Sequence, residues 1–410
     1  MALSTIENTP APDGAADQHP LAGLERLLER SIAAEDLAVP PHSPVVARVQ
    51  ELMARRGFGM AEVAALVGAD AALAADVLRC ASSPLYRRAS PVLDLTQALT
   101  RIGAQQATRL LLAAGLATHV RAPGPLAELR RLAWIEGIAS AVVCQALARQ
   151  RGLPAEDAFT LGLMHDFGRV VALAGLEGLV GAGHGAPEAD RAAWEALVDR
   201  HHLAVGALTA RRWQLPRLVR EVMALHHGAP GECADVRLLE VVRAADQVVA
   251  LTMARPRVGE EELARVMAVA PAERGPVSRA LEQVPDQVAW FEAPEAAAPE
   301  PRSRLRQPAT TLFGARRPLG LGVSVKVANR PRDYDAVAIG TEGIELVGAE
   351  HLPVNRLLEA ELRAPRPVSV WILTTLCRAE GTRHRIEARP FALTGPGRAA
   401  WDALGQPSEG

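Results

Sequence analysis

The sequence of 410 residues contains a single lysine, Lys326, so almost all of its positive charge is arginine. The formal net charge is −2 at pH 7, whereas a protein that binds nucleic acid through phosphates needs a basic surface. We therefore expect no nucleic-acid partner. Aromatic residues make up only 3% of the chain, and this scarcity, with the excess of arginine and alanine, indicates a G+C-rich coding background rather than a function.

Cysteines are also few, and they form no CxxC pair: Cys80, Cys144, Cys233 and Cys377 lie far apart. That spacing excludes the usual zinc motifs and favours free thiols in a reducing compartment. The first residues lack a basic start followed by an apolar core, and no run of 18 apolar residues occurs. We therefore expect neither a signal peptide nor a membrane span, and we predict a cytoplasmic protein.

Composition and periodicity divide the chain, whose length predicts two or three domains. Residues 1–20 are polar and rich in proline and alanine, which predicts a flexible N-terminus. Residues 21–290 carry helical periodicity throughout, which predicts one all-α domain or two packed helical lobes. In the segment SPVVARVQELMARRG, Ser43 is a suitable N-cap and Gly57 can end the helix.

The composition then changes twice. Residues 291–312 contain four prolines among charges and alanines, which predicts a semi-rigid interdomain linker. Residues 313–405 switch to a period of two in VSVKV, AVAIGTEGIELVG, LLEAELRAP, VSVWILTTLCRAEG and RHRIEARPFAL. Short strands separated by Gly, Pro and charged turns, with GRAAWDALG as a final helix, predict a small antiparallel barrel of about 90 residues.

Histidines cluster in the helical part, where six of the eleven fall between His165 and His227. His165 and Asp166 stand inside the apolar segment LGLMHDFGRVVAL, and adjacent buried polar groups are costly unless they are paired or bind a metal. Imidazole and carboxylate ligands suit Fe, Mn or Zn, and adjacent HD and HH pairs can serve two ions close together. The candidate ligands are Glu136, His165, Asp166, His202, His226, His227 and Asp246.

Such a cluster would lower the pKa of a bridging water, which could then attack a phosphate ester. The alternative is that these buried groups are satisfied by hydrogen bonds to neighbouring carbonyls and side chains. Two further histidines are predicted to lie outside the cluster. His201 is expected to be a solvent-facing neighbour of His202, and His184, in the glycine-rich GAGHGAP, is expected to lie in a loop.

The segments that hold these ligands resemble the HD superfamily of metal-dependent phosphohydrolases. The segment GADAALAADVLRCASSPLYRRASPVLDLTQALTRIGAQQATRLLLAAGLA resembles the signature region of the HDOD family, the output-domain relatives found in bacterial signalling. The resemblance runs from about Leu21 to Val284, and it implies a helical fold and, as for most relatives, a regulatory rather than catalytic role.

The resemblance also implies an incomplete metal site. HD enzymes begin with a histidine at the position that Glu136 takes here, and a carboxylate there weakens the site without abolishing it. Arg169 stands where the phosphodiesterase branch has the lysine of HDxGK, and nothing after His227 resembles the GYP motif of that branch.

The predicted barrel resembles a PilZ domain, the bacterial receptor module for cyclic di-GMP, over about residues 316–404. The likeness lies in the strand order, in AIGTEGIEL followed by a loop with proline, and in the closing RIEARPFAL. The resemblance implies a degenerate PilZ fold used for protein contact, and an unrelated small barrel is the alternative.

Ligand-binding PilZ domains carry RxxxR, whose guanidinium groups grip phosphates, and a later [D/N]xSxxG. Here only Gly343 matches the second motif, since Ala338 and Gly340 stand at the Asp/Asn and serine positions. Arg316 and Arg317 supply one half of the first motif. We therefore expect no cyclic di-GMP binding in the usual mode.

Taken together, these patterns predict a two-domain bacterial signalling regulator that binds signalling proteins through a non-catalytic HDOD domain. The barrel would be a sensor or a second contact. The competing hypothesis is a metal-dependent phosphohydrolase or cyclic-dinucleotide phosphodiesterase that uses the seven candidate ligands with Fe or Mn. A third hypothesis keeps the barrel as a cyclic di-GMP receptor.

Overall fold

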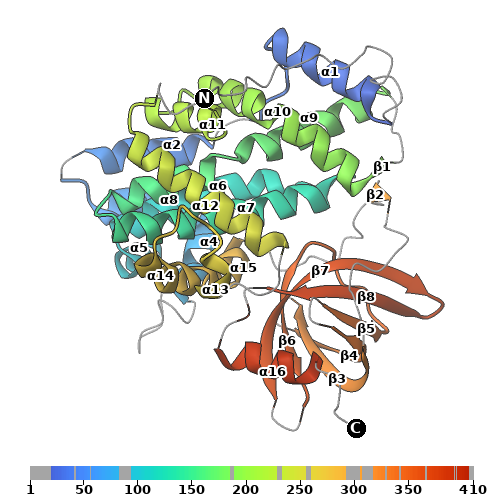
Figure 1. Cartoon of the computed structure of the whole chain (residues 1–410). Helices are drawn as coiled ribbons and strands as arrows, with labels where there is room; N and C mark the ends of the chain where they lie inside the picture. The colour runs from blue at the N-terminus through green and yellow to red at the C-terminus, as the bar shows by residue number, and fades with distance from the viewer. Residues whose placement is uncertain are drawn as a thin grey trace, which may run out of the picture.

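A computed structural model gives the fold, in which a helical part is followed by a closed barrel (Figure 1). It describes residues 20–40, 43–55, 57–82, 94–184, 189–228, 233–254, 260–291, 305–306, 317–327, 330–340, 343–364, 367–391, 393 and 395–405. The predicted flexible N-terminus and most of the predicted linker lie outside these residues, as does the CASSPLY stretch beyond Ser82.

The helical part confirms the period seen in the sequence. Apolar residues recur every three to four positions, so each helix can bury a face against its neighbours. The helices are α1 (Ala22–Ala33), α2 (Pro44–Ala54), α3 (Met60–Val67), α4 (Ala71–Ser82), α5 (Leu95–Ile102), α6 (Ala104–Arg121), α7 (Ala127–Gln150), α8 (Ala155–Met164), α9 (Phe167–Gly181), α10 (Arg191–Arg212), α11 (Arg217–Leu225), α12 (Val236–Ala254), α13 (Glu260–Leu263), α14 (Pro271–Glu282) and α15 (Val284–Phe291).

Local sequence fixes several helix ends. The Ser43 hydroxyl accepts a hydrogen bond from the backbone N–H of Val46 at 3.4 Å, so Ser43 caps α2 as predicted. The helix ends at Ala54, however, three residues before the predicted stop at Gly57. Gly103 separates α5 from α6 with a φ of 88°, in the left-handed region that glycine adopts without steric cost.

The central helix of this part is α7, which is buried on nearly all sides and packs against α8, α9, α12 and α14. Two stretches, Ala127–Gln150 and Ala155–Gly181, are long and apolar enough to cross a membrane, but both are mostly buried inside the protein. The second stretch is α8 and α9 together, with the His165–Asp166 turn between them. Burial of this kind is what the core helices of a folded domain show.

The barrel confirms the predicted small antiparallel sheet. Its strands are β3 (Arg317–Val327), β4 (Arg330–Ile339), β5 (Ile344–Gly348), β6 (Leu357–Leu362), β7 (Val368–Glu380) and β8 (Arg383–Pro390). They close in the order β3-β4-β5-β8-β7-β6, with every neighbouring pair antiparallel. The final helix α16 (Gly395–Gly405) carries the fully buried Trp401, whose indole N–H donates to the carbonyl of Gly340 at 3.1 Å.

The segment predicted as a linker contains one short strand. β2 (Leu305–Arg306) pairs in parallel with β1 (Ala189–Asp190), a two-residue strand that directly precedes α10. The chain between the two domains is therefore attached at this point to the helical part.

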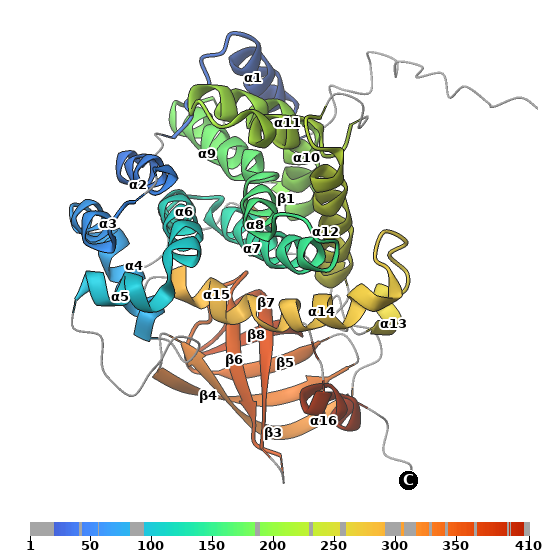
Figure 2. The same cartoon turned by 90° about the vertical axis from the view of Figure 1, so that its left-hand side faces the viewer.

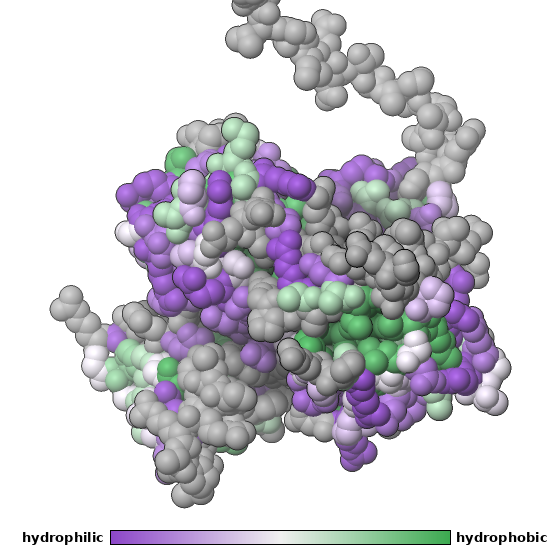
Figure 3. Space-filling view, turned by 60° about the horizontal axis from the view of Figure 1, so that its bottom comes forward, coloured by the Kyte–Doolittle hydropathy of each residue, from purple (hydrophilic) through white to green (hydrophobic). Residues whose placement is uncertain are grey.

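The barrel packs directly on the helical part. Leu357, Leu373 and Phe391 of the barrel belong to the same hydrophobic core as the helical residues. α14 and α15 lie across the barrel in Figure 2, and α15 contacts β6. The two domains therefore share a buried interface. Seen from the barrel side in Figure 3, much of the coloured surface is hydrophilic, and the largest green, hydrophobic area lies right of centre.

Candidate metal centre

Two helix junctions position the HD and HH pairs. His165 is the C-cap of α8 and Asp166 is the N-cap of α9, so this pair forms the turn between the two helices. His226 is the C-cap of α11, and His227 follows it in the next turn. Adjacent residues in such turns project in different directions, which lets each pair serve two neighbouring positions. His202 comes from the middle of α10 and Asp246 from α12.

A close helix crossing brings α10 beside the HD turn. A Cβ atom on Gly168 would lie 2.2 Å from the carbonyl oxygen of His202 and 2.8 Å from the backbone nitrogen of Gly206. No side chain fits at that distance, so α9 and α10 approach this closely only because residue 168 is glycine. The glycine in HDFGR therefore has a structural purpose that the motif alone does not show.

Asp166 lies at the centre of the cluster. Its Oδ1 is 3.1 Å from Nε2 of His226 and 3.4 Å from Nε2 of His202. With His227, these residues offer four ligand atoms that all lie within 4.8 Å of one another. Two ligands on opposite sides of one ion lie about 4.2 Å apart at a usual metal–ligand distance of about 2.1 Å, so small shifts would let these four atoms converge on one ion.

A second group shares Asp166. Nε2 of His165 lies 3.7 Å from Oδ2 of Asp166 and 3.8 Å from Oδ1 of Asp246. These three residues also offer ligand atoms within 4.8 Å of one another. Nδ1 of His227 lies 4.0 Å from Oδ2 of Asp246 and links the two groups on their outer side. The predicted pairing of HD and HH ligands around two nearby positions therefore has a geometric basis.

The hydrogen bonds of the three buried imidazoles set their orientation. Nδ1 lies beside a backbone carbonyl in His165 (Gly162, 2.8 Å), His202 (Asp199, 2.7 Å) and His226 (Val222, 3.1 Å). A carbonyl oxygen can only accept, so each Nδ1 carries the proton and each neutral ring presents a lone pair at Nε2. Fixing Nδ1 in this way is how proteins orient histidines that bind metal through Nε2.

Electrostatics keeps two of these rings neutral. Burial lowers the pKa of His202 and of His226, although Asp166 opposes that shift in both. At neutral pH the Nε2 lone pair of His202 therefore faces the Asp166 carboxylate, whereas Nε2 of His226 lies within hydrogen-bond distance of Oδ1 of Asp166, at 3.1 Å. For His165, burial also favours the neutral ring, but Asp166 and Asp246 outweigh it and raise the pKa above its usual value.

These contacts test whether a cation fits. Nε2 of His165 and Nε2 of His202 are buried and have no hydrogen-bond partner. Burial would raise the pKa of Asp166, but His165, His226 and Arg169 together hold it well below its usual range, so the carboxylate is ionised. The unpartnered Nε2 of His202 beside an ionised carboxylate in a buried space is unfavourable without a cation. The nitrogen and oxygen donors present fit iron, manganese or zinc.

Glu136 is the predicted ligand that the structure does not bring into either group. It lies on α7, and its carboxylate pairs with Arg169, with Nη1 and Oε2 3.3 Å apart. The pKa of Glu136 is raised to about 7, chiefly by burial; Arg169 opposes this shift and Asp166 adds to it. Glu136 therefore faces the cluster only across the guanidinium of Arg169.

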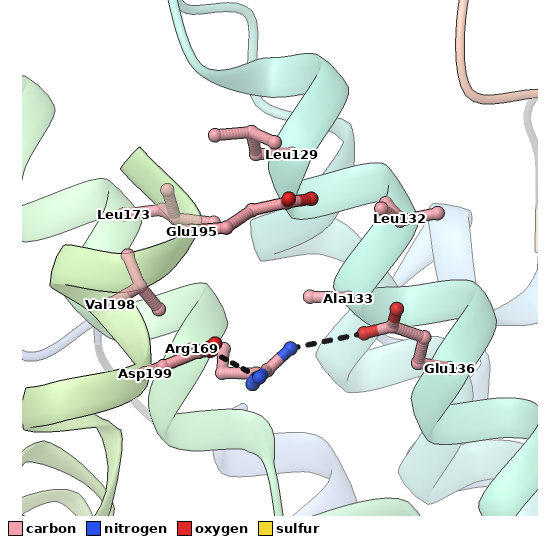
Figure 4. Close-up of a pocket in the computed structure, with 9 residues that line it drawn as sticks. All are labelled: Leu129, Leu132, Ala133, Glu136, Arg169, Leu173, Glu195, Val198 and Asp199. Atoms are coloured by element: carbon pink, nitrogen blue, oxygen red, sulfur yellow. Dashed lines mark hydrogen bonds and ion pairs between the residues drawn. The ribbon is translucent and has the colours of Figure 1, made fainter. Parts of the chain in front are cut away.

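Arg169 is the site residue whose role the sequence reasoning missed. Its guanidinium forms ion pairs with three carboxylates, and Nε lies 3.4 Å from Oδ2 of Asp166. The other two are Glu136 and Asp199, as the dashed lines in Figure 4 show. The sequence spacing could have indicated this role. Arg169 follows Asp166, the N-cap of α9, by three residues, which places both on one face of that helix.

A pocket borders this network between α7, α9 and α10 (Figure 4). Glu136, Arg169, Glu195 and Asp199 give it a polar end and rim, and the remaining lining is apolar: Leu129, Leu132, Ala133, Leu173 and Val198. Its free volume is about 20 Å³, which is enough for a single water molecule. A phosphate ester does not fit in this pocket as it stands.

The two neighbouring histidines behave differently from each other. His184 is exposed and follows the turn after α9, outside both ligand groups, as predicted. The prediction for His201 is wrong, because its side chain is only 14% exposed. Its Nε2 lies 2.9 Å from Oε1 of Glu25 on α1, and the adjacent Arg200 pairs with the same carboxylate. Packing of α1 against α10 covers this ring. The sequence around His201 alone does not indicate that contact.

The helical fold agrees with a comparison with known families. Residues 39–229 match the model of the HDOD domain. The helical part of the chain therefore contains an HDOD domain, which confirms the resemblance drawn from the motifs.

Individual relatives are distant. A protein of Shewanella amazonensis SB2B, a metal-dependent phosphohydrolase by name, is 24% identical with a TM-score of 0.51 over 66% of this chain and 100% of that one. A signal transduction protein, by name, of Marinobacter aquaeolei VT8 is 18% identical with a TM-score of 0.47 over 66% of each chain. An uncharacterized protein of Treponema pallidum is 24% identical over 50% of this chain and 40% of its own length. The chain thus spans about two fifths of that relative.

Proposed function

We propose that this chain is a bacterial signal-transduction regulator whose HDOD domain holds a divalent metal ion, with iron or manganese as the candidates. It acts by binding signalling proteins and does not hydrolyse a phosphate ester. The observation that carries the proposal is the place of Arg169. This guanidinium stands between Asp166 of the cluster and the adjoining pocket, and it is already committed to three carboxylates.

An ion in the cluster would be held by residues of both groups: His165, Asp166, His202, His226, His227 and Asp246. When bound, a divalent ion supplies Lewis-acid activation of water. The surrounding residues of this chain do not support the rest of a hydrolytic reaction. Glu136 is drawn to Arg169 and away from the ligand groups, and the pocket beside them has room for about one water.

The test measures metal content and turnover in the same full-length, untagged preparation. We expect close to one equivalent or more of iron or manganese in the wild type, and its loss when His165→Ala and Asp166→Ala are combined. His184→Gln is the matched control, because His184 is exposed and outside both groups. The metal-loaded protein should not hydrolyse bis(p-nitrophenyl) phosphate or cyclic dinucleotides. Absence of metal, or turnover that follows metal content, would overturn the proposal.

A second candidate function is a metal-dependent phosphohydrolase, and the outer side of the cluster favours it. The side chains of His227 and Asp246 are 46% and 31% exposed, so solvent reaches the cluster there without passing Arg169. Turnover that disappears in the His165→Ala, Asp166→Ala double variant and persists in His184→Gln would establish this reading.

The barrel enters the main proposal as a PilZ-like second contact surface. Ala338 and Gly340 offer neither a carboxylate nor a hydroxyl where the usual motif needs them, and the Gly340 carbonyl is engaged by Trp401. The Arg316 and Arg317 side chains lie outside the described residues. Calorimetry of the full chain with cyclic di-GMP at high micromolar concentration should give no binding heat. Saturable binding at one or two ligands per chain would make the barrel a receptor instead.

A further inference from the structure

Asn355 is buried where the barrel meets the helical part. It lies in the loop between β5 and β6, and only 1% of its surface is exposed. Its φ of 54° is in the left-handed region, which asparagine tolerates better than most residues other than glycine. Its backbone N–H donates to the carbonyl of Thr374 on β7 at 2.8 Å. The loop therefore holds this side chain in one place.

The side chain of Asn355 joins two helices of the HDOD domain. Its Nδ2 donates to the carbonyl of Glu128 on α7 at 2.9 Å, and its Oδ1 accepts from Nη1 of Arg191 on α10 at 3.3 Å. An amide is suited to this position because it offers a donor and an acceptor on one group. Arg131 of α7 also donates to the carbonyl of Val354, at 2.9 Å. The barrel thus holds the first turns of both helices.

The same two helices line the pocket beside the cluster. Beyond Arg191, which pairs with Glu195 at 2.7 Å, α10 carries Asp199 and then His202. On α7 the pocket continues as far as Glu136. At that far end Arg169 pairs with Glu136 of α7 and with Asp199 of α10, so the two helices are linked again.

We propose that Asn355 is a positioning residue through which the docked barrel sets the spacing of α7 and α10, and with it the pocket and the place of His202 in the cluster. The part of this inference that concerns metal affinity rests on the proposed function. The physical reason is that a helix moves as a rod: His202 lies eleven residues after Arg191 on α10, about three turns. A shift in the position of the α10 N-terminus therefore also moves the His202 imidazole, which lies 3.4 Å from Asp166.

The test uses three variants of the full chain. Asn355→Gly removes both side-chain hydrogen bonds and keeps a residue that suits a φ of 54°. Asn355→Asp keeps the acceptor for Arg191 and loses the donor to Glu128. Arg398→Gln is the matched control, because it removes another contact between the domains, a 3.5 Å ion pair with Glu262, without touching α7 or α10.

Two measurements are made on each variant. Calorimetry with Mn²⁺ should show an affinity about tenfold lower for Asn355→Gly, as expected when support of a metal ligand is lost. Asn355→Asp should fall between that variant and the wild type, and Arg398→Gln should equal the wild type. Amide hydrogen exchange of the metal-free proteins should quicken in the first turns of α7 and α10 in Asn355→Gly and not in Arg398→Gln.

Each result decides the question. Unchanged exchange in Asn355→Gly, or equal changes in Arg398→Gln, would overturn the positioning role. Faster exchange with an unchanged Mn²⁺ affinity would overturn the link to the cluster. If the wild type binds no Mn²⁺, iron or other divalent ion, the proposed function fails, and the exchange comparison alone decides whether Asn355 sets the helix spacing.

Discussion

Asn355 and Arg169 link the same two helices, α7 and α10, at opposite ends of one pocket. Asn355 does so from the barrel through neutral and charge-assisted hydrogen bonds, and Arg169 does so from α9 through ion pairs. The spacing of α7 and α10 therefore depends at one end on the docking of the barrel and at the other end on the charge of Arg169.

Arg169→Gln should increase the affinity of the cluster for Mn²⁺. The substitution removes a positive charge whose Nε lies 3.4 Å from Oδ2 of Asp166. This charge competes with a cation for the same carboxylate and repels it, an effect that an effective dielectric constant of about 20 weakens but does not abolish. We expect a gain of about tenfold by calorimetry. Arg211→Gln is the control, because that arginine pairs with Glu35, which belongs to none of the candidate ligand groups. A loss of affinity would show that Arg169 supports the ligands more than it competes with the ion.

Glu136 should make stability depend on pH. Its pKa of about 7 in the folded chain lies above the ordinary value of 4.5, so the folded state binds the proton more tightly than the unfolded state. Stability from this group is therefore lost as pH rises toward and through 7. Relative to Glu136→Gln, the metal-free wild type should lose on the order of 2 kcal/mol between pH 5.5 and 8. Urea unfolding at both pH values checks this, and parallel losses in the two proteins would contradict it.

His202 and His201 are sequence neighbours with different expected effects. His202→Gln should lower Mn²⁺ affinity by tenfold or more, since its Nε2 is one of the atoms that surround Asp166. His201→Gln should leave the affinity unchanged and cost only a modest amount of stability, because its ring contacts Glu25 on α1. Calorimetry and urea unfolding of both variants distinguish the two effects. Equal losses of affinity would mean that α10 as a whole, and not the His202 ring, determines binding.

Gly168→Ala should destabilise the metal-free chain by about 1–3 kcal/mol, because the new methyl group would overlap the His202 carbonyl at 2.2 Å. Gly178→Ala, on the same helix, is the control, since nothing lies within 4 Å of its added Cβ. That variant should gain up to about 1 kcal/mol from helix propensity. Chemical unfolding in chelator measures both. A neutral Gly168→Ala would show that α9 and α10 can separate at little cost.

Much of the fold follows from sequence periodicity, because both domains bury one face of each regular element. The alternation in VSVKV and RIEAR predicts strands, and the 3.6-residue period around His165 and Asp166 predicts buried helices. The parallel pairing of Leu305 with Ala189 was not predictable, since two residues carry no period and their partner lies 116 positions away. The shared interface of the two domains was not predictable either, because the period of a strand shows which residues are buried but not which element covers them.

The sequence predicted which residues form the candidate site, but not which of them pair with one another. Six of the seven candidate ligands come together because each sits at a helix junction or on a buried helix face, which local sequence indicates. Glu136 departs from them because a cation three positions after Asp166 draws its carboxylate away. Which nearby charge a carboxylate pairs with depends on how the helices cross, here α7 and α9, and the sequence of a single helix does not specify that crossing.

The single apolar core that runs from the helices into Leu357, Leu373 and Phe391 determines whether the two domains can be studied separately. Severing the polypeptide after α15 would turn those three side chains outward into water, with a cost of roughly 25 cal/mol for each Å² uncovered. Each isolated domain would then expose an apolar surface, prone to nonspecific binding, that is buried in the full chain. Ligand or partner screens on an isolated domain would detect binding to this newly exposed surface. Such screens should therefore use the full chain.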